Sequence, residues 1–259
     1  MIGSLPSRHA SYLDTIIRKL SSDRRFVALL AGGSLVHGEF DDYSDLDLIP
    51  VVQADDYDCV LSERHSIAAG VDTLLAAFTG EHVGEPRLLI CLYGPELLHV
   101  DLKFVIPSAL NHMVEHPKIL WARDPEAMEK LLDQARVAWP ELSPGWFEAR
   151  AWIWLHYGAT KLQRGELYEA MGMVAFFREK VLGPMLHRRA GKPQRGLRKI
   201  ERQDISAMAA LEPTVAVHTG SSVRDALKAC AGLYLDLRND NPPPSTVPGM
   251  PQLLDAILQ

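Results

Sequence analysis

The chain has 259 residues, of which 47% are hydrophobic and 23% are charged, close to the average for globular proteins. This composition excludes a mainly disordered chain, a coiled coil and a collagen-like repeat. The 33 acidic and 27 basic residues give a net charge of −6, which disfavours general nucleic-acid binding because that binding depends on neutralising phosphates. The length fits one large domain or two modest ones.

The cysteine content and the apolar runs bear on location. Cys59, Cys91 and Cys230 are too few and too far apart for a zinc cluster or a disulfide framework, and indicate thiols in a reducing compartment. The first residues contain no apolar stretch of signal-peptide length, and no apolar run approaches the roughly 18 residues that span a membrane. We therefore expect a cytoplasmic protein without membrane association.

The first half of the chain mixes helical and strand patterns. Tyr12, Leu13, Ile16, Ile17 and Leu20 recur at helical spacing and predict the first helix. Further along we expect helices over 60–78, 108–116 and 125–138, and strands over 26–31, 46–52, 87–93 and 97–106.

The second half is expected to be helical throughout. Residues 139–145 contain two prolines and a glycine and are a plausible boundary, and no strand pattern follows them. Helical patterns cover 146–163, 167–189 and 223–238. We therefore expect an α+β domain over 1–140 and an all-helical domain over 141–259.

A pair of carboxylates opens the second strand. Asp45 and Asp47 come ten residues after a Gly33-Ser34 turn that follows the first strand. Side chains alternate along a strand, so the two aspartates project to the same face. Neighbouring carboxylates repel one another unless a hard cation lies between them, and Mg²⁺ typically binds one or two carboxylates together with substrate phosphates.

A third carboxylate lies in a later strand. His99, Asp101 and Lys103 alternate with apolar residues, which places Asp101 on the polar face. If this strand lies beside the one bearing Asp45 and Asp47, three carboxylates converge. Such a set could hold two metal ions about 4 Å apart, as in phosphoryl-transfer sites.

The Gly33-Ser34 turn fits the phosphate side of the same site. Glycine allows a close approach of the backbone to a phosphate, and the backbone N–H groups and the Ser34 hydroxyl can face anionic oxygens.

The spacing of Gly33-Ser34, Asp45, Asp47 and Asp101, over residues 26–104, resembles the DNA polymerase β-like nucleotidyltransferase superfamily. The length and the helical second half are similar to antibiotic nucleotidyltransferases of the aminoglycoside or lincosamide type. The resemblance implies a small mixed sheet flanked by helices. It also implies a nucleoside triphosphate, held through Mg²⁺, whose α-phosphate is attacked by an acceptor while pyrophosphate leaves.

The resemblance also implies roles for single residues. Asp45 and Asp47 would ligate two Mg²⁺ ions, and Asp101 would ligate the catalytic one and is a candidate to draw the proton from the acceptor. In similar enzymes a lysine from the helical half meets the triphosphate, which makes Lys161 a candidate. Glu166 is a candidate to face the acceptor. Two solvated side chains at a helix end remain the alternative for this pair. Lys103 is a further candidate for nucleotide binding.

The predicted function is transfer of AMP from ATP to a hydroxyl of a small molecule. Acidic residues around the expected cleft would suit a cationic acceptor such as an aminoglycoside; they are Glu39, Asp41, Asp42, Glu166 and Glu169. The alternative hypothesis is a nucleotide-binding regulatory or antitoxin-like module that acts on a protein or RNA partner.

Several other patterns suggest different chemistry. Gly33–Gly38 begins like a P-loop, but Glu39-Phe40 stands where the loop needs Lys and Ser or Thr. His112-Met-Val-Glu-His116 matches a zinc-peptidase pattern if it is helical, although Pro117 follows it. Arg150 and His156 match the loose spacing of HEPN-type ribonucleases. A basic run over 187–202 is either a solvated face or a patch for phosphates.

Overall fold

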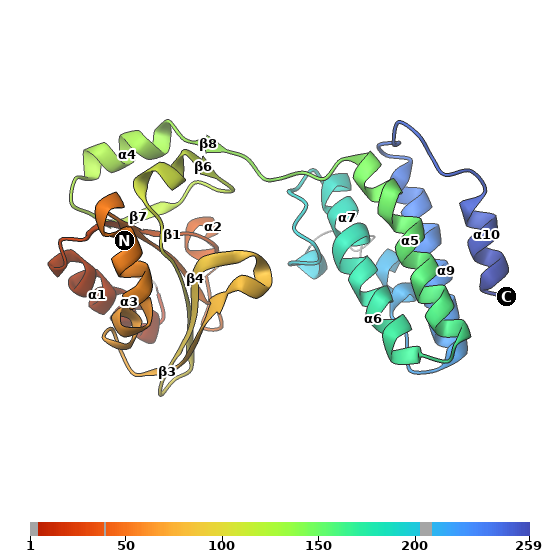
Figure 1. Cartoon of the computed structure of the whole chain (residues 1–259), viewed down its shortest axis with the longest axis horizontal. Coiled ribbons are helices and arrows are strands. Elements are labelled where there is room, and N and C mark those ends of the chain that lie inside the picture. Colours follow the sequence, from red (N-terminus) through yellow and green to blue (C-terminus); the bar gives the residue numbers. More distant parts are fainter. Residues whose placement is uncertain (1–4, 39, 203–208) are drawn as a thin grey trace. The chain divides into compact units, whose positions relative to one another are not determined.

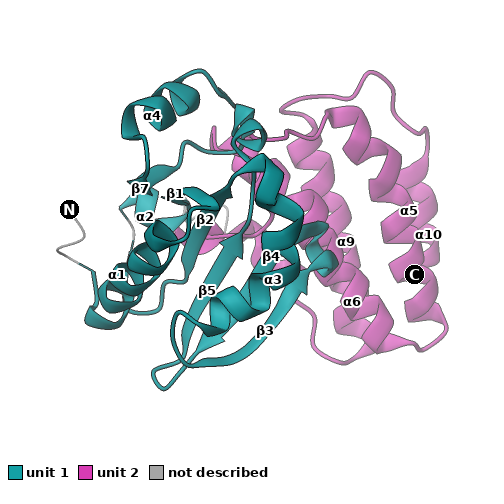
Figure 2. Cartoon of the chain, turned by 60° about the vertical axis from the view of Figure 1, so that its left-hand side comes forward, with its two compact units in different colours: residues 1–138 teal, residues 139–259 magenta. Residues whose placement is uncertain are grey.

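The computed structural model describes residues 5–38, 40–202 and 209–259. The chain divides into two compact units, residues 1–138 and residues 139–259, coloured separately in Figure 2. Glu39, one of the expected acidic residues, lies outside the described residues. Within the described ranges, no helix is both long and apolar enough to cross a membrane.

A six-stranded mixed sheet forms the first unit, in the order β3-β4-β5-β2-β1-β7. β2 and β5 are parallel, and every other neighbouring pair is antiparallel. The strands are β1 (Phe26–Ala31), β2 (Leu46–Val52), β3 (Leu74–Gly80), β4 (Glu85–Tyr93), β5 (Leu98–Lys103) and β7 (Lys118–Ala122). β6 (His112–Met113) and β8 (Arg136–Val137) form a separate parallel pair.

Helices cover the sheet on both faces. α1 (Ser7–Ser22) and α3 (Tyr57–Ala69) share one apolar core with the sheet and lie over the same face, as Figure 2 shows. α4 (Pro125–Asp133) and the 3₁₀ helix η3 (Pro107–Asn111) pack with Ala28 and Leu30 on the other side of β1. β1 is therefore buried on both faces, which explains its continuous apolar sequence.

The short segment that carries the expected phosphate turn connects β1 to β2. α2 (Ser34–His37) begins directly after Gly33 and ends at Gly38, and both glycines have positive φ angles. The chain then turns back through Asp41–Ser44 into β2. This connection brings the start of α2 to the same end of the sheet as Asp47.

The sequence placed two helices wrongly. Residues 60–78 were expected to be one helix, but α3 ends at Ala69 and 74–80 form the edge strand β3. Leu74–Phe78 is rich in Leu and Ala, which favour helix, and pairing with β4 overrides that preference. Residues 108–116 were also expected to be helical; they form η3 and then β6, and 125–138 is helical only to Asp133.

The second unit is a helical bundle in the residues described. Its main helices are α5 (Pro144–Gln163), α6 (Leu167–Phe177), α7 (Gly183–Arg189), α9 (Gly220–Arg238) and α10 (Met250–Ile257), with a π-helical turn η4 (Arg178–Leu182) between α6 and α7. α5 runs beside α6 in Figure 1. The mixed sheet flanked by helices and the helical second unit confirm the expected fold class.

A buried carboxylate fastens the bundle. Glu148 is 4% exposed and accepts hydrogen bonds from Trp152 Nε1 at 3.0 Å, Val247 N at 3.1 Å, Arg238 Nη1 at 3.2 Å and the Tyr234 hydroxyl. Burial alone would raise the pKa of Glu148, but these hydrogen bonds outweigh it and lower the pKa. The ionised form therefore ties α5 to α9 and to the segment before α10.

Glu148→Gln should lower the free energy of unfolding of the second unit by about 3 kcal/mol, because it leaves the Arg238 charge without its partner. Four of the five tryptophans lie in this unit, so urea unfolding followed by tryptophan fluorescence measures the change. The difference in unfolding free energy between wild type and Glu148→Gln should persist at pH values above the ordinary glutamate pKa. It should disappear as the pH falls through the lowered pKa of Glu148. Glu141→Gln, at an exposed position, is the control; equal losses from both variants would contradict the assignment.

Candidate functional site

Two of the predicted carboxylates are direct neighbours in the sheet. Asp47 of β2 and Asp101 of β5 are register partners in the parallel pair, so their side chains project side by side from the same face. The residues before and after them, including Leu46 and Leu102, are buried on the opposite face. The strand pairing on which the three-carboxylate prediction depends is therefore present.

Asp101 is partly buried beside a histidine. Its side chain is 23% exposed, and His99 Nε2 lies 2.9 Å from Asp101 Oδ1. Burial raises the pKa of the Asp101 carboxyl, the His99 hydrogen bond lowers it in part, and the charge of Asp45 raises it further. Asp45, just before β2, thus belongs to the same electrostatic cluster.

Gly33 lies directly against Asp47. Its φ is +59°, and a Cβ built on it would lie 1.9 Å from Asp47 Oδ2. The neighbouring Gly32 N–H donates to the Asp47 carbonyl oxygen at 2.9 Å. A side chain at position 33 would be strained by the backbone conformation and would collide with the carboxylate. The glycine turn and the Asp47 carboxylate are therefore in direct contact.

A fourth carboxylate, which the sequence analysis did not assign, contacts the same turn. Glu115 Oε1 accepts a hydrogen bond from Gly33 N at 2.8 Å, and Glu115 Oε2 lies 2.7 Å from His37 Nε2. Glu115 belongs to the segment between β6 and β7, 82 residues from Gly33. The sequence placed it in a helical zinc-peptidase pattern; His112 is instead a strand residue, so that helical turn does not form.

Ser34 and Lys103 show different surroundings. Ser34 Oγ is buried and has no hydrogen-bond partner in the part of the chain that the structure describes. Lys103 lies on the Asp101 face of β5, with Nζ 2.8 Å from Glu85 Oε2. Glu85 also pairs with Arg87, whose hydrogen bonds are the main reason that its pKa falls to about 2. A nucleotide would have to compete with Glu85 for Lys103.

Lys161 and Glu166 contact each other in the second unit. Lys161 Nζ lies 2.6 Å from Glu166 Oε2 and also pairs with Glu169, while Arg164 Nε lies 2.8 Å from Glu166 Oε1. The Glu166 hydrogen bond is the main reason that the pKa of Lys161 is raised. The two candidates form one ionic cluster, and their roles toward triphosphate and acceptor stay predictions.

The donor chemistry of the sheet site fits Mg²⁺. Among the described residues, no group of three or more His, Cys, Asp or Glu side chains is arranged to hold a metal ion. Mg²⁺ needs fewer protein ligands, since it retains waters and takes phosphate oxygens, and Asp47 and Asp101 present oxygen donors from adjacent strands. Burial and the charge of Asp45 raise the pKa of Asp101 because they disfavour its ionised form. A bound cation would stabilise that ionised form.

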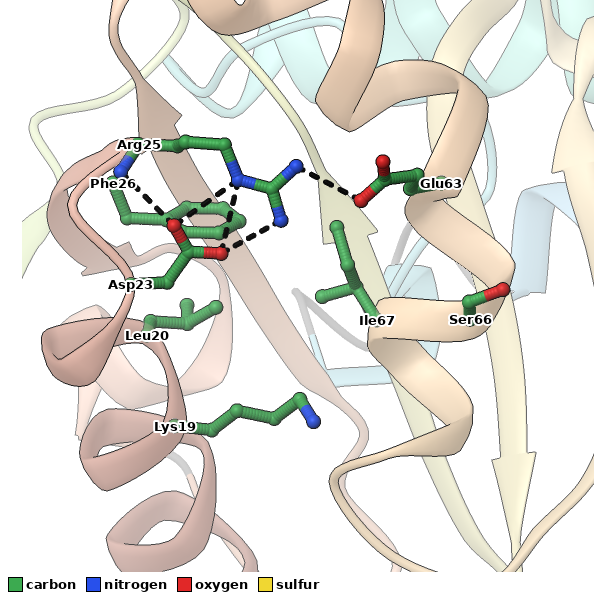
Figure 3. A pocket seen from close by; sticks show the side chains of 8 residues that line it. All are labelled: Lys19, Leu20, Asp23, Arg25, Phe26, Glu63, Ser66 and Ile67. Carbon is green, nitrogen blue, oxygen red and sulfur yellow. Dashed lines mark hydrogen bonds and ion pairs between the residues drawn. The ribbon is translucent and has the colours of Figure 1, made fainter.

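A pocket of about 250 Å³ elsewhere in the first unit has a structural explanation (Figure 3). Arg25 fills one side, with hydrogen bonds to Asp23 at 2.7 Å and to Glu63 at 2.8 Å. These bonds join the end of α1 to α3, and Lys19, the other charged group of the lining, donates to the Gly70 carbonyl oxygen.

Two other patterns from the sequence have local partners. Arg150 lies over the Trp146 ring at 4.3 Å and donates to the Trp146 carbonyl oxygen. In the basic run, Arg189 pairs with Asp236 and Asp240 of the same bundle. These contacts account for both arginines as structural residues.

Comparisons with known proteins give little similarity. No protein-family model matches the chain. No curated protein matches it. Among solved structures, a nucleotidyltransferase-like protein from Exiguobacterium sibiricum matches with 16% sequence identity and a TM-score of 0.42, over 87% of this chain and 74% of that chain. A similarity of this size assigns no role to any residue of the present chain.

Asp101→Asn should raise the free energy of unfolding at neutral pH by about 1 kcal/mol, because it removes a partly buried charge beside Asp45 and Asp47 and keeps an acceptor for His99. Calorimetry with metal chelated measures the change. The gain should vanish below about pH 3.9, where Asp101 is protonated in both states. Asp55→Asn, on an exposed turn, should show no gain. A destabilised Asp101→Asn variant would mean that the carboxylate anchors the fold.

Proposed function

We propose that the protein is a Mg²⁺-dependent nucleotidyltransferase that moves a nucleoside monophosphate, AMP from ATP, to a hydroxyl of a small molecule. The observation that carries the proposal is the placement of Asp47 beside Asp101 with Gly33 packed against Asp47. A cation site and a backbone turn able to approach a phosphate are thereby combined at one end of the sheet.

Asp47 and Asp101 would hold the metal, and Asp45 would add its negative charge beside them. Bound Mg²⁺ would offset the negative charge that develops on the α-phosphate and on the departing pyrophosphate. The protein supplies the positions of the carboxylates, which the parallel ladder between β2 and β5 fixes. The Gly33 N–H and the Ser34 hydroxyl, whose oxygen is buried without a partner within the described residues, are suited to phosphate oxygens.

Asp101 would also accept the proton of the acceptor hydroxyl. The acceptor hydroxyl forms a new bond to the α-phosphorus, the bond to the pyrophosphate oxygen breaks, and the hydroxyl proton passes to a carboxylate oxygen. His99 Nε2 lies 2.9 Å from Oδ1 of Asp101 and would orient the carboxylate toward the acceptor hydroxyl. Asp101 would therefore act on the acceptor as well as on the cation.

The charges leading into the site favour a cationic acceptor. Asp41 and Asp42 are exposed in the loop that enters β2 just before Asp45. An amino sugar such as an aminoglycoside carries hydroxyl groups that can accept the nucleotide, and ammonium groups that an acidic surface attracts. The two aspartates of this loop support a cationic acceptor, although the Arg8 guanidinium, which donates to the Asp42 carbonyl oxygen, offsets part of their charge.

Asp47→Asn should weaken Mg²⁺-dependent binding of a non-hydrolysable ATP analogue about 100-fold, because it removes one charge from the metal site while preserving the side-chain shape against Gly33. Isothermal titration calorimetry with and without Mg²⁺ measures the loss. Asp55→Asn is the matched control and should bind like wild type. Wild-type affinity in Asp47→Asn, or binding that ignores Mg²⁺, would refute the proposed function.

A further inference from the structure

One carboxylate takes two donors at the glycine turn. The Glu115 oxygens lie 2.8 Å from Gly33 N and 2.7 Å from His37 Nε2, distances typical of charge-assisted hydrogen bonds. An ionised carboxylate only accepts hydrogen bonds. The proton of the His37 ring is therefore on Nε2, and this N–H donates a hydrogen bond to Glu115. Gly33 and His37 therefore act as a pair of donors for a single two-oxygen anion.

The Gly33 N–H and the His37 ring N–H can also donate to two oxygens of a phosphate. Two oxygens of a phosphoryl group have nearly the spacing of a carboxylate's two oxygens, so they can replace them on the same N–H groups. The Ser34 hydroxyl, between these donors in the chain, has a buried oxygen without a partner in the described part of the chain. Glu115 thus occupies a site whose chemistry suits a larger anion.

We propose that Glu115 is an internal occupant of the phosphate site at the glycine turn, held there by the Gly33 N–H and the His37 ring, and that the triphosphate displaces it and takes over both donors. This inference rests on the proposed function. It assigns His37 to the nucleotide and makes Glu115 the residue that sets nucleotide affinity.

Glu115 has to leave Gly33 before a triphosphate can bind there. Asp47 Oδ2 lies against the Cα of Gly33, and Glu115 Oε1 lies on its N–H, so Gly33 already has a carboxylate on two sides. While Glu115 Oε1 holds the Gly33 N–H at 2.8 Å, a phosphate oxygen cannot take that donor, and the two like charges would repel each other. Glu115 lies between β6 and β7, outside both strands, so its departure breaks no strand pairing.

Glu115→Gln tests the inference in the full-length protein. Gln keeps an acceptor for the Gly33 N–H but removes the charge, so binding of a non-hydrolysable ATP analogue with Mg²⁺ should tighten about tenfold in calorimetry. Glu129→Gln, on the exposed face of α4, removes the same charge elsewhere in the first unit and should leave the affinity unchanged.

His37→Asn, introduced into the Glu115→Gln background, tests the second donor. It should weaken analogue binding about fivefold, because the ring then no longer serves the phosphate. In ¹⁵N-labelled wild-type protein, the Gly33 amide signal should shift on analogue binding, and the signal of the nucleotide-free Glu115→Gln variant should already differ from that of wild type. A merely structural Glu115 would give none of these affinity changes.

The outcomes separate the two claims. Wild-type binding with equal or weaker binding by Glu115→Gln would overturn the inference and leave the proposed function standing. No binding by either folded protein would overturn both. If Glu115→Gln does not fold, Glu115→Asp replaces it: its carboxylate is one methylene short of the two donors, so affinity should rise about threefold, and an unchanged or lower affinity would overturn the inference.

Discussion

The register of two adjacent parallel strands, which sets two carboxylates side by side, is the constraint on which the candidate site depends. Asp47 and Asp101 are held side by side by the ladder between β2 and β5, and their flanking residues are buried on the other face. A shift of either strand by one residue would turn its carboxylate into the core, so the apolar pattern that fixes the fold also fixes the site. Such a cluster costs stability without a cation, which is the common signature of a functional site.

Hydrogen-bond donors contact the carboxylates of this site. His99 donates to Asp101, while Gly33 and His37 donate to Glu115. Acceptors and donors therefore alternate around the glycine turn, one set suited to a cation and the other to an anion. A metal–triphosphate complex carries both kinds of charge and can satisfy both sets together.

The sequence predicted the parts of the site that local patterns encode. The β1 strand follows from a continuous apolar run, and alternation at the start of β2 and along β5 predicted the shared face on which Asp47 and Asp101 lie. Edge strand β3 was missed because helix-favouring residues form it, and pairing with β4 decides its structure. Glu115 was unpredictable in its role, because its contact with Gly33 joins segments 82 residues apart and leaves no spacing signal.

The account stands or falls on whether the Asp47–Asp101 pair binds a divalent cation. Titration of the ¹⁵N-labelled protein with Mn²⁺, which broadens the signals of nearby nuclei, answers this most directly. We predict that the amides of 46–48, 100–102 and Gly33 broaden first, and that Asp47→Asn abolishes this selectivity. Broadening elsewhere, or uniform broadening unaffected by Asp47→Asn, would contradict the central claim.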